Sequence, residues 1–235
     1  MKRIFLFGFI SGFPWVLIGS ALSLWLKEND LSRSTIGCPR LIFSVYAINF
    51  LWAPLVDRVK IPYLSNRIGH RKSWIILMQT IILISLAAWS VLNPAVNLWL
   101  IILIGLGIAI SSATQDITID ALRIEQIKKN ESQAMAAGAA VQVVGWWTGY
   151  KIGGAISLIS AEFFQQKGLE NYWQMSFLLM SLIVIISSIA LFFVPEKDSK
   201  KRNIAQRKND YILLKKLKIK NQFSKIFVWI YGTVC

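Results

Sequence analysis

The sequence contains few of the residues on which soluble enzymes and disulfide-bonded domains depend. Of its 235 residues, 2 are cysteines and 1 is a histidine. Cys38 and Cys235 are too few for a disulfide framework and show no metal-ligand spacing. The sequence also contains no metal-binding or phosphate-binding motif, around His70 or elsewhere. It therefore predicts no metal and no cofactor, and we do not expect the protein to be an enzyme.

Charged residues are scarce as well. They make up 16% of the chain, against 55% hydrophobic residues, and they are clustered. Asp, Glu, Lys and Arg are absent from residues 5–26, 73–115 and 171–194. As a helix, each of these segments can cross a hydrocarbon core of about 30 Å. Only helices and closed barrels satisfy their backbone groups in lipid, and these segments lack the alternation of barrel strands. We therefore expect an all-α protein embedded in a lipid bilayer.

The apolar segments predict six transmembrane helices. Their approximate positions are residues 4–26, 36–56, 74–92, 98–119, 133–160 and 171–195. The basic start of the first segment also suits a signal peptide, but the apolar run continues to Leu26, which favours a retained helix. Residues 1–195 are then expected to form one six-helix bundle.

The composition changes sharply after this bundle. Residues 196–222 contain ten Lys or Arg residues, and we interpret them as a basic cytoplasmic loop that attracts anionic lipid. Residues 223–235 are apolar again, but a membrane span needs about 20 residues. We interpret this last segment as an incomplete seventh span, so that the fold is truncated at the start of a seventh helix.

The net charge of +14 comes from Lys and Arg residues that lie between and after the spans. Such an excess can indicate a nucleic-acid partner, but no recognition motif accompanies it here, and we expect none. In membrane proteins, Lys and Arg in short loops mark the cytoplasmic side. The loop between the second and third spans contains Asp57 against five basic residues, Arg58, Lys60, Arg67, Arg71 and Lys72. We therefore expect this loop, the N-terminus and the basic tail to be cytoplasmic.

Two carboxylates, Asp116 and Asp120, lie within or at the end of the fourth predicted span. Their spacing of four residues places them on one helix face. An ionisable group inside a membrane costs roughly 2.5–3.5 kcal/mol, so each is a functional candidate. Burial disfavours the charged form of a carboxylate, which allows it to bind and release a proton near neutral pH. Asp116 lies about 6 Å deeper and is the better proton-coupling candidate. Asp120 can instead be hydrated at the interface and paired with Arg123.

Glycines are concentrated in the first and fifth spans. The first span contains Gly8, Gly12, Pro14 and Gly19, which predict a flexible or kinked helix, as in gating elements but also in inert membrane helices. In the fifth span, glycines recur at every fourth position from residue 145 to residue 153. Glycines at this spacing let helix backbones approach closely, so we expect a packing role.

Two cations are candidates for lining a substrate cavity. Lys151 lies inside the fifth span, where it either contacts an anionic substrate or extends toward the interface. A direct ion pair with Asp116 is not expected, because the two residues lie in opposite halves of the membrane. Arg40, near the outer start of the second span, is the other cavity candidate, with an interfacial position as the alternative.

Several motifs together resemble the AmpG muropeptide permeases of the major facilitator superfamily. These motifs are Gly8-Phe-Ile-Ser-Gly-Phe-Pro14, Phe50-Leu-Trp-Ala-Pro-Leu-Val-Asp57-Arg58, Gly69-His-Arg71-Lys72, Ser112-Ala-Thr-Gln-Asp116 with Asp120, and Gly149-Tyr-Lys151. The resemblance covers nearly all of residues 5–195 and implies the N-terminal half of a secondary transporter. The implied function is symport: proton-coupled import of anhydro-muropeptides across the bacterial inner membrane for peptidoglycan recycling.

The resemblance also implies roles for individual residues. A cytoplasmic gating motif, which latches the two halves of such transporters, is matched by Asp57, Arg58, Arg71 and Lys72. Asp116 and Asp120 match the acidic pair of the fourth span. Two positions depart from the family pattern, with Lys151 where an Arg is expected and Asn49 where a Lys is usual. A lysine lacks the bidentate geometry with which arginine binds a carboxylate, so these differences bear on the substrate.

Transporters of this superfamily enclose their substrate between two six-helix halves, and the sequence predicts one half. Three interpretations stay open. A second half-transporter chain or a homodimer completes the pore; the chain is a truncated, non-transporting remnant; or it is a relative that carries another solute, such as a coenzyme A ester.

Overall fold

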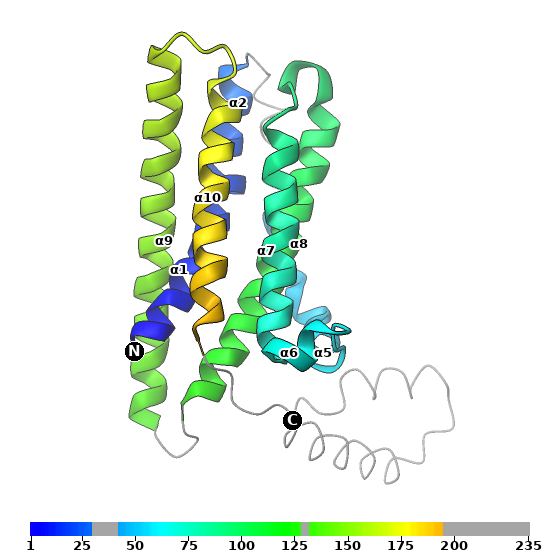
Figure 1. Ribbon diagram of the computed structural model, residues 1–235, viewed down its shortest axis with the longest axis vertical. Coiled ribbons are helices and arrows are strands. Elements are labelled where there is room, and N and C mark those ends of the chain that lie inside the picture. Colours follow the sequence, from blue (N-terminus) through cyan, green and yellow to red (C-terminus); the bar gives the residue numbers. More distant parts are fainter. Residues whose placement is uncertain (30–41, 128–131, 195–235) are drawn as a thin grey trace, which may run out of the picture.

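The computed structural model describes residues 1–29, 42–127 and 132–194, which form a bundle of long helices (Figure 1). Strands are absent from these residues, so the all-α prediction is confirmed. In chain order the elements are α1 (Lys2–Val16), the π-helix η1 (Leu17–Ala21), α2 (Leu22–Glu28), α4 (Ser44–Ile48), the 3₁₀ turn η3 (Asn49–Leu51), α5 (Ala53–Arg58), α6 (Leu64–Ile68), α7 (His70–Trp89), α8 (Pro94–Gln126), α9 (Ser132–Gln166) and α10 (Tyr172–Phe192). The predicted basic loop and seventh span lie outside the described residues.

Within the described residues, four helical segments are long and apolar enough to cross a membrane, at Lys2–Glu28, His70–Trp89, Pro94–Gln126 and Tyr172–Phe192. They coincide with the first, third, fourth and sixth predicted spans. α9 lies at the fifth predicted span and has 35 residues, but its Gln, Lys, Gly and Trp residues make it less apolar. The described part of the second predicted span forms the short elements α4, η3 and α5. The number of six spans therefore stays a prediction.

The first span is continuous but locally irregular. α1, η1 and α2 follow one another without a break, and Leu17–Ala21 adopt π-helical geometry. The irregularity follows Pro14, which has no N–H and so removes one helical hydrogen bond, and it includes Gly19. π-helical turns inside α-helices are frequent at functional sites. The sequence predicted a flexible or kinked helix here; the structure shows a π-helical turn in a continuous helix, and the flexibility stays a prediction.

α1 and α9 pack with their backbones in direct contact (Figure 1). A Cβ atom added at Gly8 or Gly12 of α1 would overlap backbone atoms of α9. Conversely, a Cβ atom added at Gly145 or Gly149 of α9 would overlap the backbone of α1. The packing role predicted for the fifth-span glycines is therefore confirmed, and the first-span glycines form the other half of the same interface.

Aromatic side chains fill the core where α2, α7 and α10 meet, at the upper end of the bundle in Figure 1. Trp25, Trp89, Trp173 and Phe177 are each at most 2% exposed. The Trp25 ring lies 4.9 Å from the Phe177 ring and 6.1 Å from the Trp89 ring, measured between centroids. These contacts hold the three helices together at the end opposite α5 and α6.

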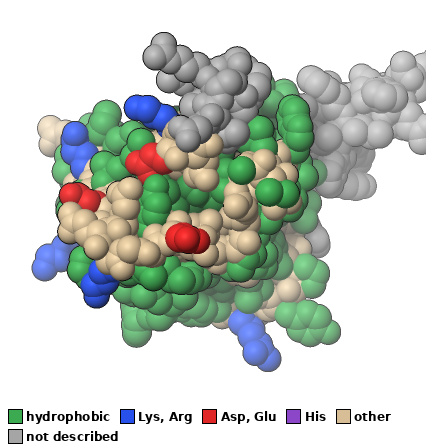
Figure 2. Space-filling model, turned by 90° about the horizontal axis from the view of Figure 1, so that it is seen from above, with side chains coloured by type: hydrophobic (Ala, Val, Ile, Leu, Met, Phe, Trp, Pro, Cys, Tyr) green, Lys and Arg blue, Asp and Glu red, His purple; other side chains and the backbone are tan. Residues whose placement is uncertain are grey.

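The outside of the bundle is largely apolar. Ile84, Ile186 and Phe193 are 65%, 65% and 82% exposed, which suits contact with lipid chains rather than water. Figure 2 views the molecule from above; on the face in view, hydrophobic side chains are widespread, and Asp, Glu, Lys and Arg side chains lie at separate places. The structure therefore agrees with a multi-pass membrane protein.

Candidate proton and gating sites

Asp116 of α8 is held against α1. The hydroxyl group of Ser11 donates a hydrogen bond to Asp116 Oδ1. The preceding residue, Gln115, is fully buried, and its Nε2 donates to the carbonyl oxygen of Ile10 at 3.0 Å. Two consecutive residues of α8 thus contact two consecutive residues of α1. The Asp116 side chain is half-buried, which is the setting expected for a proton-binding carboxylate.

Asp120 lies one helical turn farther along α8 and is more accessible, with 55% of its side chain exposed. Its Oδ1 accepts a hydrogen bond from Gln142 Nε2 of α9 at 2.8 Å and lies 3.5 Å from Arg123 Nη2. The contact with Arg123 agrees with the Arg123-paired alternative that the sequence left open, while hydration at the interface stays a prediction. α8 also continues to Gln126, beyond the predicted end of the fourth span, so Asp120 lies within the helix.

Both carboxylates line one pocket of about 270 Å³ between α1, α8 and α9. Its lining residues are Ser11, Asp116, Asp120, Arg123, Ala139, Gln142, Val143 and Trp146. Two acids, one cation and two neutral hydrogen-bonding groups therefore lie around one open space. The predicted pairing of the acids on one helix face therefore corresponds to a shared pocket.

Lys151 lies away from this pocket. Its side chain is exposed, and its Nζ lies 5.8 Å from the ring centroid of Trp147, one turn back on α9. This is within the range of a cation–π contact. The expectation that Lys151 forms no direct ion pair with Asp116 agrees with these positions. Arg40, the other predicted cavity residue, lies outside the described residues.

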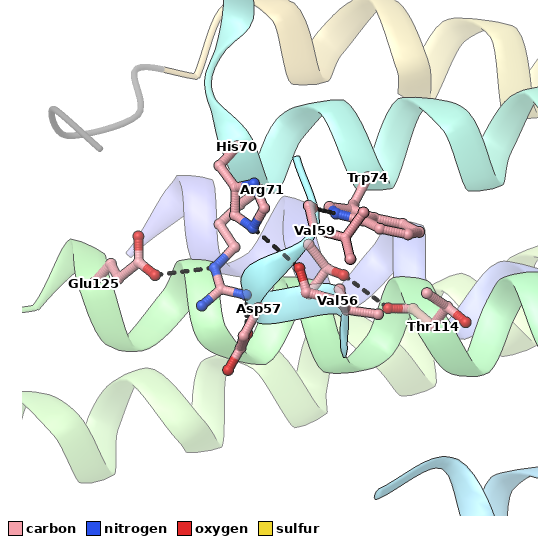
Figure 3. Close-up of polar contacts among 9 residues, drawn as sticks. Val56, Asp57, Val59, His70, Arg71, Trp74, Thr114 and Glu125 are labelled. Atoms are coloured by element: carbon pink, nitrogen blue, oxygen red, sulfur yellow. Dashed lines mark hydrogen bonds and ion pairs between the residues drawn. The ribbon is translucent and has the colours of Figure 1, made fainter. Parts of the chain in front are cut away.

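Two of the predicted gating residues, Asp57 and Arg71, meet where α5, α7 and α8 converge (Figure 3). The Arg71 guanidinium group, 6% exposed, binds Asp57 of α5 and also Glu125 of α8 through Nε at 3.1 Å. His70 Nε2 lies 3.0 Å from the carbonyl oxygen of Val56. We call Asp57, Arg71 and Glu125 the ion-pair triad; it joins three helices at the lower end of the bundle.

The other two gating residues flank the triad. Lys72 is 6% exposed, and its Nζ donates to the carbonyl oxygen of Phe192 at the end of α10, at 3.3 Å. This cation therefore binds a helix C-terminus, where the carbonyl groups carry a partial negative charge. Arg58 is half-buried at the end of α5, next to Asp57. The structure thus brings the four predicted residues into one region.

Sequence reasoning missed four residues of these two sites: Ser11, Gln142, Trp146 and Glu125. Glu125 was counted only as a loop charge, because the fourth span was predicted to end before it. Ser11 precedes Gly12 on the face that contacts α8 and α9, and Gln142 lies four residues before Trp146 on α9. The helical spacing of these polar residues beside the glycines was the available signal.

Comparison with known proteins identifies relatives of this chain. A Rickettsia felis protein named as an AmpG 4 transporter is 38% identical over 196 residues, which are 83% of this chain and 45% of that protein. The anhydromuropeptide permease of Escherichia coli is 33% identical over 189 residues, or 80% of this chain and 36% of the permease. The chain thus spans less than half the length of these relatives.

The fold also resembles that of a transporter of known structure. The crystal structure of a D-xylose–proton symporter aligns with 96% of this chain and 53% of its own, with a TM-score of 0.53 and 15% sequence identity. At that identity the likeness concerns the fold alone. The sequence profile of the Major Facilitator Superfamily matches residues 4–235. The chain therefore belongs to the Major Facilitator Superfamily, and AmpG-type transporters are among its relatives.

Proposed function

We propose that this chain forms half of a proton-coupled permease that imports anhydro-muropeptides across the bacterial inner membrane for cell-wall recycling. The names of its AmpG-type relatives support the substrate. The observation that carries proton coupling is the half-buried Asp116, held by Ser11 in a pocket that also contains Asp120. A carboxylate in that position can cycle between charged and neutral forms.

Protonation of Asp116 changes the contact between α1 and α8. The ionised carboxylate only accepts hydrogen bonds, and it accepts one from Ser11. Once protonated, the carboxyl group gains a donor and is a weaker acceptor, so the Ser11 hydrogen bond weakens or reverses its direction. Because α1 is fixed to α9 through glycines, this change moves α8 relative to the α1–α9 pair. In this way proton binding can bias the conformation of the whole half.

Asp116→Asn is the decisive variant. The chain is reconstituted in proteoliposomes together with any membrane protein that co-purifies with it. With acid outside, these proteoliposomes are expected to accumulate labelled anhydro-muropeptide, and Asp116→Asn should abolish this accumulation. Glu162→Gln is the matched control, since Glu162 is an exposed acid on α9 that accepts a hydrogen bond from Gln166 and does not line the Asp116 pocket. Uptake that is absent in the wild type, or unchanged in Asp116→Asn, refutes the proposal. Absence of uptake in the wild type favours a non-transporting chain. Uptake of a coenzyme A ester instead favours the alternative solute.

A second half is needed for alternating access, in which one half rocks against the other around the substrate. We propose that it comes from further sequence of the same protein, from a second copy of this chain or from a separate half-transporter chain. Native mass spectrometry of the chain purified from transport-competent membranes separates these cases. A homodimer, or a complex with a second membrane protein, is expected; a transporting monomer excludes both.

We further propose that the loop between α5 and α7 faces the cytoplasm, as does the N-terminus. Tyr63 in that loop and Val96 near the start of α8 are 86% and 79% exposed, at opposite ends of the bundle. In a background without Cys38 and Cys235, a cysteine replacing Tyr63 should react with a membrane-impermeant thiol reagent only in inverted vesicles. A cysteine replacing Val96 should react only in intact cells. The reverse pattern refutes this orientation.

A further inference from the structure

Aromatic side chains from three helices meet directly beside the Asp116 pocket. We call them the aromatic platform: Trp15 of α1, Phe43 and Tyr46 at α4, and Trp146, Trp147 and Tyr150 of α9. The Trp15 ring lies 4.4 Å from that of Tyr46 and 5.5 Å from that of Trp146, between centroids. Trp146 also lines the pocket, so the platform and the proton site are continuous.

The platform differs from the aromatic core near α2. In that core Trp25, Trp89 and Phe177 are at most 1% exposed, as expected of side chains that only fill space. The platform side chains are instead half-buried, and Trp147 is 50% exposed. The rings of Trp146 and Tyr150 are parallel, with an interplanar angle of 2° and centroids 5.6 Å apart. The platform side chains are therefore accessible to a ligand, and two of their rings lie parallel.

Three buried polar atoms beside the platform make only loose contacts with their polar neighbours, Trp15 with Asp116 and Tyr46 with Ser112. Trp15 Nε1, Tyr46 Oη and Ser112 Oγ are buried and make no well-formed hydrogen bond to any residue that the structure describes. Trp15 and Tyr46 both lie near Asp116. Buried polar groups in native proteins nearly always have a partner, so such atoms indicate a place where a polar ligand or water binds.

We propose that the aromatic platform is a carbohydrate subsite, in which the sugar portion of the muropeptide stacks on Trp146 and Tyr150. This inference rests on the proposed function and specifies which residues hold the sugar. A pyranose ring has apolar C–H faces and a rim of hydroxyl groups. It therefore matches flat aromatic faces bordered by a few polar atoms, the usual composition of a ligand site. Tyr46 and Trp15 supply hydrogen bonds to the rim.

The position of the platform also indicates where the other parts of the substrate lie. Along α9, Gln142 contacts Asp120, Trp146 lies one turn on, Tyr150 one turn beyond that, and Lys151 follows. A sugar on the platform lies between the proton site and the cation. The carboxylate groups of the attached peptide then extend toward Lys151. Sugar and proton share Trp15 and Tyr46 as neighbours, which provides a route for coupling their binding.

Calorimetric titration of the full chain in lipid nanodiscs tests the subsite. The probes are an anhydro-muropeptide, its sugar portion alone, its peptide alone, and adenosine as another flat ligand. The main variant is Tyr150→Leu, with Tyr150→Phe to restore the ring. Trp99→Leu is the matched control, because Trp99 is 78% exposed at the far end of α8. Trp146→Leu is a second variant, and circular dichroism verifies that each variant keeps its helices.

The wild type is expected to bind the sugar portion, and Tyr150→Leu should weaken that binding about threefold to tenfold. Tyr150→Phe and Trp99→Leu should bind it like the wild type, and the free peptide should be insensitive to Tyr150→Leu. The inference is overturned if the sugar does not bind, if Tyr150→Leu binds it normally, or if adenosine binds at Tyr150 in its place. Proton-driven uptake together with peptide-only binding leaves the proposed function intact and removes the subsite. Sugar binding without proton-driven uptake supports the subsite and refutes the proposed function.

Discussion

Replacing Gly149 by alanine tests the packing on which the pocket depends. The new methyl carbon would stand less than 3.0 Å from the carbonyl oxygen of Phe9, a separation that Cβ atoms essentially never show. The obstacle is backbone, so no side chain can rotate out of the way. α1 and α9 must therefore separate by roughly 1 Å to restore ordinary contact. Overpacking of this kind costs about 1–3 kcal/mol, and we expect a loss of about 2 kcal/mol in the free energy of unfolding.

Gly154→Ala is the control for this experiment. Gly154 lies on the same helix, but no atom of another described helix lies within 4 Å of the added Cβ position. Alanine at that site should leave the stability unchanged or raise it by up to about 1 kcal/mol, because glycine is the weaker helix former. Unfolding in detergent with increasing denaturant, followed by circular dichroism, measures both variants. Equal stability of the two variants would falsify the claim that α1 and α9 require glycine at their contact.

Two further predictions concern polar contacts. Arg71→Lys should lower the free energy of unfolding by about 1–2 kcal/mol, since lysine cannot bind both carboxylates of the ion-pair triad in a fork. In the same unfolding assay, its effect should be non-additive with that of Glu125→Gln, whereas additive effects would mean that the two side chains are independent. Asp120→Asn should reduce proton-driven uptake less than Asp116→Asn, because Asp120 is 55% exposed and already reaches water. A larger loss from Asp120→Asn would make Asp120 the main proton carrier.

The sequence predicted those features that depend on local pattern. Apolar runs without charge fixed the positions of four spanning segments, and the spacing of Asp116 and Asp120 placed both on one face. The glycine spacing around Gly149 indicated close helix packing. Each of these follows from the helix period and the cost of charge in lipid, which act on the chain alone.

The features that the sequence did not predict depend on tertiary contacts or on local breaks in the chain. The pairing of Arg71 with Glu125 joins residues 54 positions apart, and no local pattern encodes it. The described part of the second span is apolar like its neighbours, yet it is divided into short helices. Pro54 at the start of α5 explains part of this, because proline lacks an N–H and restricts the residue before it. Hydropathy alone does not detect such a break.

α8 connects the two candidate sites, which leads to the last prediction. Asp116 contacts α1, while Glu125 contacts Arg71 of α7, and the two acids lie about 13 Å apart along one helix. Because a helix moves as a stiff unit, a shift of α8 that follows protonation of Asp116 also strains the contact of Glu125 with Arg71. Glu125→Gln should therefore change the dependence of uptake on external pH, although Glu125 does not line the pocket. An unchanged pH profile, with uptake retained, would mean that the ion-pair triad and the proton site work independently.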